Sequence, residues 1–150
     1  MASRSREEEE LRKLSVELRY FEQTAETLQQ RISMMNAAIT DLTYANMTLD
    51  GIEKEKENAE ILVPIGGSSY VKVKLAAPDK VVVGMGAGVS LEKTLPEAKA
   101  MLKERLGELE KTMVSAQQQF AQVAERINAG RNRLESLLAT AREGKASGDV

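Results

Sequence analysis

The sequence predicts an α+β fold in which a long antiparallel two-helix coiled coil is joined by two β-hairpins that assemble, between chains, into an oligomeric β-barrel base. Apolar residues recur with heptad spacing in both flanking segments and with period two in the middle, and aromatic residues make up only 3% of 150 residues. We expect one domain, with coiled-coil helices in 1–58 and 94–143, the hairpins in 59–93, and a polar, disordered tail in 144–150.

The first helix is expected over 7–57, because six heptads of apolar residues run from Leu11 to Leu49 without proline or glycine. One seam position holds Leu11, Leu18, Ala25, Ile32, Ile39 and Asn46, and the other holds Leu14, Phe21, Leu28, Met35, Leu42 and Leu49. A seam this narrow is typical of a coiled coil. Its one polar residue, Asn46, is expected to fix the register of pairing at some cost in stability.

The second helix repeats the heptad pattern. One seam position holds Leu106, Met113, Phe120, Ile127, Leu134 and Ala141, and the other holds Leu95, Leu102, Leu109, Ala116, Val123, Gly130 and Leu137. The preceding Thr94 and the following Glu97 form the signature of a capping box, in which each side chain bonds the other residue's backbone N–H group. Pro96 falls in the first turn, where its missing N–H group does no harm.

The two helices are expected to pair in antiparallel fashion because a compact insert joins them. In the register we predict, the numbers of two facing residues sum to 148, as those of Leu11 and Leu137 do. Seam residues then lie opposite seam residues along both helices. Small residues then often face large ones, as Gly130 faces Leu18, which suits packed layers. This register places the polar Asn46 close to the hairpins, beside Leu102.

The middle segment predicts four strands in two hairpins, with turns at Gly66–Ser68, at Ala77–Lys80 and at Gly84–Gly88. An isolated hairpin is marginally stable in water, and its unpaired edges seek partners. We therefore expect the strands to be buried between chains. The residues expected at this interface are Leu62, Val63, Ile65, Val71, Val73, Leu75, Val81, Val82, Val83, Val89 and Leu91.

The composition argues against several classes of function. The chain has no cysteine and no histidine, which excludes disulfides, Cys/His metal sites and Ser-His-Asp nucleophiles. A net charge of −2 indicates no nucleic-acid or membrane partner, and no apolar stretch reaches the ~18 residues of a membrane span. Glycines in Gly84–Gly88 precede a strand rather than the helix of a nucleotide loop. We expect a soluble, cytoplasmic protein that is no enzyme and uses no cofactor or metal.

Two strand segments carry a family resemblance. Residues Leu62–Lys72, LVPIGGSSYVK, resemble the first hairpin of α-type prefoldin subunits, and Val83–Lys93, VGMGAGVSLEK, resembles their second hairpin. The helix, two hairpins and helix of the α-type layout cover nearly the whole chain. The resemblance implies a hexamer of two α and four β subunits, with a double β-barrel body. It also implies capture of unfolded clients between coiled-coil ends, transfer to a group II chaperonin without nucleotide, and an archaeal source.

The ends of the two helices are the candidate client-binding surface. Leu11, Leu14, Leu18, Leu134 and Leu137 are seam residues near these ends, and Val16, Tyr20 and Leu138 lie outside the strict seam. Helix ends fray, so the last layers can open and present apolar groups to unfolded chains. The alternative is a seam that stays closed to its end, and the residues alone do not decide between the two.

Two functions therefore compete at this point. The first is an ATP-independent chaperone subunit that binds unfolded proteins and delivers them to a chaperonin. The second is a structural coiled-coil scaffold that tethers folded partners. The family resemblance favours the first, and indifference to unfolded proteins would favour the second.

Overall fold

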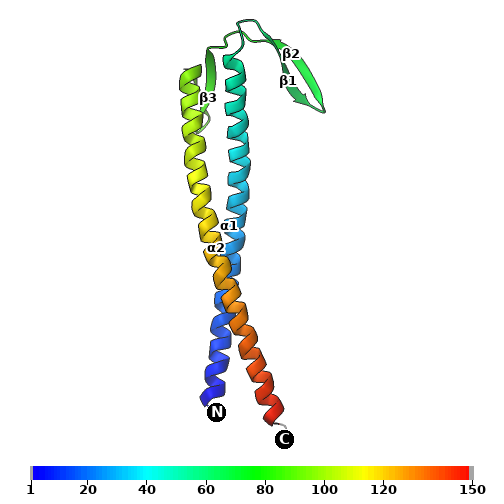
Figure 1. The fold of residues 1–150 in the computed structure, drawn as a ribbon, viewed down its shortest axis with the longest axis vertical. Coiled ribbons are helices and arrows are strands. Elements are labelled where there is room, and N and C mark those ends of the chain that lie inside the picture. Colours follow the sequence, from blue (N-terminus) through cyan, green and yellow to red (C-terminus); the bar gives the residue numbers. More distant parts are fainter. Residues whose placement is uncertain (1, 149–150) are drawn as a thin grey trace. The chain divides into compact units, whose positions relative to one another are not determined.

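The computed structural model describes residues 2–148 and contains six elements in the order α1–β1–β2–β3–β4–α2 (Figure 1). Their bounds are α1 Ala2–Glu53, β1 Glu60–Gly66, β2 Ser69–Lys74, β3 Lys80–Gly86, β4 Val89–Thr94 and α2 Leu95–Gly148. The chain divides into two compact units. The coiled-coil unit comprises the residues up to Asn36 and those from Thr112 onward, and the hairpin unit comprises Ala37–Lys111. The order of elements confirms the predicted combination of two long helices and two hairpins.

The C-terminal ends of both helices differ from the expected ones. α1 ends at Glu53 rather than at residue 57, and the chain then turns through Asn58, which adopts a left-handed φ of 64°. α2 runs on to Gly148, so the tail expected in 144–150 is helical as far as it is described, and residues 149–150 lie outside the described part. An established helix extends at little cost per residue, which explains the additional turn.

The coiled-coil unit buries the predicted seam. Its buried side chains are Leu18, Leu28, Met35, Met113, Ala116, Ile127 and Leu137, and every one occupies a predicted seam position. A Cβ atom built on Gly130 would lie 2.8 Å from Leu18 Cδ2, so glycine at this position makes room for the leucine. This contact between Gly130 and Leu18 is the one that the antiparallel register predicts.

The hairpin unit has its own small core where β3 meets the two helices. Leu49 of α1, Val83 of β3 and Leu95 and Ala98 of α2 form a buried cluster, and Ile52, Val81, Met101 and Leu102 pack around it. Ala98 has no exposed surface, and its small side chain lets the helices approach closely at this point. One hairpin is therefore anchored to the helices of its own chain.

An exposed ion-pair cluster joins α1 to α2 beside this core. Lys99 Nζ lies 2.8 Å from Asp50 Oδ1 and also bonds the Glu53 carboxylate. The hydrogen bond from Lys99 lowers the pKa of Asp50 below its ordinary 3.8, and the bonds that Lys99 donates raise its own pKa above 10.5. The cluster therefore stabilises the fold at neutral pH. Its contribution is lost as pH falls through the lowered pKa of Asp50, or as pH rises through the raised pKa of Lys99.

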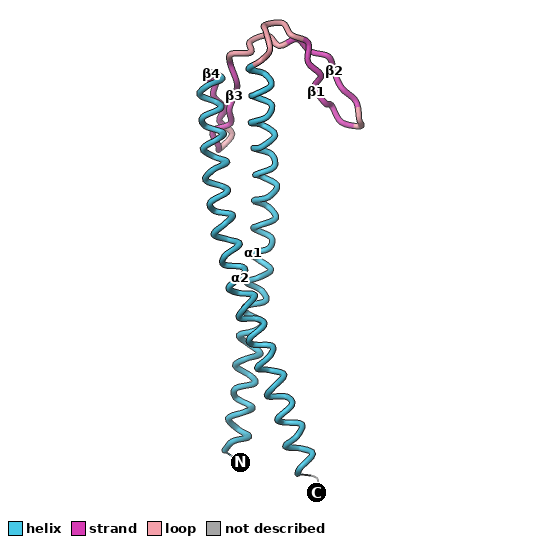
Figure 2. Tube along the Cα trace, viewed as in Figure 1, coloured by secondary structure: helices cyan, strands magenta, loops and turns pink. Residues whose placement is uncertain are grey.

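The two hairpins are built alike (Figure 2). β1 pairs with β2 and β3 with β4, each antiparallel, and each pair contains one register shift, between Pro64 and Gly66 or between Gly84 and Gly86. Gly66 and Gly86 have φ values of 98° and 95°, which a residue with a side chain rarely adopts. The same bulge therefore occurs twice, at positions that correspond in the two hairpins.

The predicted capping box at the start of α2 is confirmed. Glu97 N donates to Thr94 Oγ1 at 3.3 Å, and Thr94 N donates to Glu97 Oε2 at 3.3 Å. Leu95 N donates to the Asp79 carbonyl at 2.8 Å, which ties the first residue of the helix to the turn before β3. Thr94 is thus the last residue of β4 and the cap of α2 at the same time.

Candidate functional site

The first candidate site is the helix-end surface, formed by the eight apolar residues predicted near the helix ends. Three side chains are largely exposed: Val16 at 70%, Tyr20 at 64% and Leu138 at 43%. Leu18 and Leu137 are buried, and the other three, Leu11, Leu14 and Leu134, are half-buried. The surface is thus divided into an exposed set outside the seam and a covered set within it.

The exposed set does not come from one helix. Val16 and Tyr20 are one turn apart on α1 and therefore share a face, whereas Leu138 lies on α2 next to the buried Leu137. Leu18 and Leu137 would become accessible only where the last turns of α1 and α2 separate. The helix-end surface can therefore offer a small apolar area when closed and a larger one when open.

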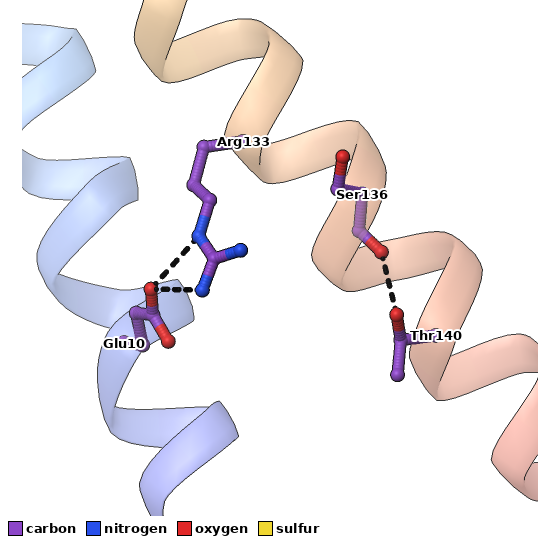
Figure 3. A network of polar contacts seen from close by, with 4 residues as sticks. All are labelled: Glu10, Arg133, Ser136 and Thr140. Atoms are coloured by element: carbon purple, nitrogen blue, oxygen red, sulfur yellow. Dashed lines mark hydrogen bonds and ion pairs between the residues drawn. The ribbon is translucent and has the colours of Figure 1, made fainter.

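Ion pairs between the helices hold these turns together. Glu10 Oε1 accepts hydrogen bonds from Arg133 Nη2 at 2.8 Å and Nε at 3.0 Å (Figure 3). Further from the helix ends, Glu22 Oε1 accepts a bond from Arg131 Nη2 at 3.1 Å. All four side chains are substantially exposed, so each pair stabilises the closed helix ends by only about 0.2–1 kcal/mol. A binding partner can outweigh a contribution of this size.

Sequence reasoning missed these two pairs, although a signal for them exists. Glu10 precedes the seam residue Leu11, and Arg133 precedes the seam residue Leu134. Positions that flank a coiled-coil seam face each other across the two helices, and opposite charges there stabilise one orientation of the helices. Tracing the charges beside the seam in the predicted register would have brought Glu10 and Arg133 together.

The second candidate site is the pair of hairpins. Leu62, Ile65, Val82 and Val89 are more than half exposed, and Val63, Val71 and Leu91 are exposed at 39–46%. Val83 is an exception among the predicted interface residues, because it is 4% exposed and packs in the core of its own chain. Leu75 lies just past β2 and exchanges backbone hydrogen bonds with Asn58 and Ala59.

One face of the β1–β2 hairpin carries two apolar pairs. Ile61 pairs with Val73 and Val63 with Val71, and residues directly opposite each other in a ladder point to the same side. No buried cluster covers this face in the described part of the chain, whereas β3 uses Val81 and Val83 against the helices. The β1–β2 hairpin therefore carries an apolar face that its own chain leaves uncovered.

Asn46 lies at a seam position in the hairpin unit, and its Nδ2 atom is buried without a hydrogen-bond partner among the described residues. We expect Asn46→Leu to raise the free energy of unfolding by about 1–2 kcal/mol, because it removes an unsatisfied donor and fills the seam with apolar atoms. Urea denaturation followed by circular dichroism measures this. Asn128→Leu on the exposed surface of α2 is the control and should change stability little. A destabilised Asn46→Leu protein would show that the amide has a partner in solution.

No helix in residues 2–148 is long and apolar enough to cross a membrane.

The arrangement described above can be compared with known proteins. The model of the prefoldin subunit family matches residues 21–140. Prefoldin subunit alpha of Methanococcoides burtonii is 32% identical over 120 residues, which are 80% of this chain and 87% of that relative. The corresponding subunit of Methanosarcina barkeri is 37% identical over 109 residues, which are 71% of this chain and 76% of that relative.

Solved structures agree with these relatives. A chain in the cryo-EM structure of filamentous PFD from Methanocaldococcus jannaschii is 27% identical, with a TM-score of 0.63 over 74% of this chain and 92% of that chain. The prefoldin beta subunit from Thermococcus strain KS-1 is 17% identical, with a TM-score of 0.56 over 84% of this chain and 90% of that one, and this likeness concerns the fold alone. From the family model, the sequence identity and the paired hairpins together, we conclude that the chain belongs to the prefoldin subunit family.

Proposed function

We propose that this chaperone subunit binds unfolded proteins at its helix-end surface without ATP and delivers them to a group II chaperonin. The observation that carries the proposal is the exposure of Val16, Tyr20 and Leu138 beside a leucine seam that is flanked by exposed ion pairs. Apolar side chains rimmed by charge suit weak and reversible contact with many sequences. Frayed helix ends would add seam leucines to that contact.

The proposal includes assembly through the hairpins. The uncovered apolar face of β1–β2 and the free edges of both hairpins favour pairing with strands of other chains. The family relationship supports β-type prefoldin subunits as partners, in a hexamer of two α and four β subunits around a double β-barrel. A cytoplasmic location belongs to the same proposal, and the absence of cysteine from the sequence is compatible with a reducing compartment.

The test is an aggregation assay on the complex formed with a co-expressed one-hairpin prefoldin subunit. We expect the complex to suppress aggregation of a chemically denatured client in the absence of nucleotide and to release that client to a group II chaperonin. Native, folded proteins should not compete for the same sites. Selective binding of one folded protein, together with no effect on the denatured client, would instead establish a scaffold and contradict the proposal.

A further inference from the structure

A groove lies between α1 and α2 in the coiled-coil unit. It has a volume of about 310 Å³, and its residues are Phe21, Thr24, Leu28, Gln119, Gln122, Val123 and Arg126. It continues over α1 into a second hollow of about 400 Å³, which shares Thr24 and Leu28 and adds Tyr20 and Arg31. The apolar side chains of Phe21, Leu28 and Val123 form the floor, and polar side chains form the rim.

The charges of this groove are all of one sign. Neither hollow is lined by an acidic residue, and the two cations, Arg31 and Arg126, form no ion pair within the described residues. By contrast, Arg131 and Arg133 on the same unit are both paired with glutamates. The Arg126 guanidinium lies 5.5 Å from the centre of the Phe21 ring, which holds a cation directly beside an aromatic surface.

The groove opens onto a stretch of both helices with few charges. In the facing segments 24–36 and 112–124 only Glu26 and Arg31 are charged, in a chain whose charged fraction is 29%. Thr24 and Thr27 also turn their hydroxyl groups inward, because they donate to the Tyr20 and Gln23 carbonyls at 2.9 and 3.0 Å. Apart from Arg31 and Arg126, the residues that line the groove therefore carry no charge.

The remaining polar groups suit a polypeptide backbone. The amides of Gln119 and Gln122 each offer donors and an acceptor at the rim, which an extended chain can use for its own N–H and C=O groups. A folded protein has already paired most of those groups and presents a convex surface to a narrow groove. The chemistry of the groove therefore fits an extended segment better than a folded domain.

We propose that this groove is a second client-contact site, which selects extended segments that carry an aromatic or aliphatic side chain next to a carboxylate. The apolar side chain would lie on Phe21 and Leu28, and the carboxylate would pair with Arg126 or Arg31. The inference rests on the proposed function, because it assigns a preferred class of client sequence. It differs from the helix-end surface, whose apolar residues carry no such charge preference.

The test measures peptide binding to the complex formed with the one-hairpin partner. The probe is a fluorescent Gly/Ser peptide that contains two Phe-Asp pairs, and the comparison peptide has Asn in place of each Asp. We expect the combined Arg31→Gln and Arg126→Gln variant to raise the Kd of the Phe-Asp peptide about five-fold and to leave that of the Phe-Asn peptide unchanged. The matched control, Arg12→Gln with Arg19→Gln, makes the same charge change on α1 outside the groove.

Equal weakening by the control variant, or no weakening by the groove variant, would overturn the inference. A Phe-Asp peptide with a photoreactive group on the phenyl ring should cross-link to residues 21–31 or 119–126. Cross-links confined to 2–18 and 132–144 would assign the binding to the helix ends instead. Aggregation assays on the same complexes separate the two proposals. If the unaltered complex protects the client but does not discriminate between the two peptides, only the groove is rejected. If it discriminates between the peptides without any protection, only the holding function is rejected.

Discussion

A complex trimmed of residues 1–20 and 132–150 is expected to assemble normally and to lose most of its protection of a denatured client. The cut removes the whole helix-end surface and the Glu10–Arg133 ion pair, but it leaves the seam from Phe21 onward and the Glu22–Arg131 pair. The shortened helices keep most of their buried layers, so the trimmed chain should stay folded. Light scattering of an aggregating client measures protection, and the mass of the complex measures assembly.

Full-length variants separate loss of apolar surface from loss of helix length. Replacing Val16, Tyr20 and Leu138 with serine should weaken protection strongly, because these side chains are the exposed part of the helix-end surface. The control replaces Met34 and Val114 with serine, which are exposed at 74% and 52% elsewhere on the helices. Full protection by the trimmed complex would refute the assignment of client binding to the helix ends, whatever the serine variants do.

The second large effect is expected at the hairpins, where Val63→Asp should leave the chain unable to join a complex. Val63 is 39% exposed in the single chain and belongs to the apolar face of β1–β2, opposite Val71. A carboxylate at this position should change the stability of the single chain little, because the side chain is partly in contact with water. In a shared β core it would be a buried, unpaired charge. That penalty is about 3 kcal/mol or more, which weakens association at least a hundred-fold.

Analytical ultracentrifugation of Val63→Asp with the one-hairpin partner reports this effect directly. Circular dichroism should show unchanged helix content, because the substitution lies outside α1 and α2. Val114→Asp places the same charge on an exposed position of α2 and should assemble as the unaltered chain does. If Val63→Asp forms complexes of full mass, this face of the hairpin is not the assembly surface.

Much of the fold follows from local patterns in the sequence. Heptad spacing is a strong signal for helices of this length, and the Thr94–Glu97 box marks the start of α2 because its bonds form within one turn. The Gly130–Leu18 contact follows from pairing the two seams. The end of α2 was less predictable, because extending a helix over a few polar residues changes its free energy very little.

The candidate sites were less accessible to sequence reasoning. Burial of Leu18 and Leu137 depends on whether the last layers are closed, and the spacing of leucines does not determine this. Val83 and Val63 occupy equivalent strand positions, yet only Val83 packs against the helices, because β4, the partner strand of β3, runs directly into α2. The groove beside Arg126 depends on the conformation of a long side chain, for which the sequence contains no pattern.

Thr94 is both the last residue of β4 and the cap of α2, and this limits where residues can be inserted into the chain. Since β4 ends at Thr94 and α2 begins at Leu95, one inserted residue at this junction would rotate α2 about its axis by about 100° relative to β4. Leu95 and Ala98 would then leave the cluster with Leu49, and the whole seam would turn from its partner. The irregular chain between α1 and β1 can absorb an insertion without such a rotation. Length variation among related chains should therefore collect before β1 and be excluded after β4.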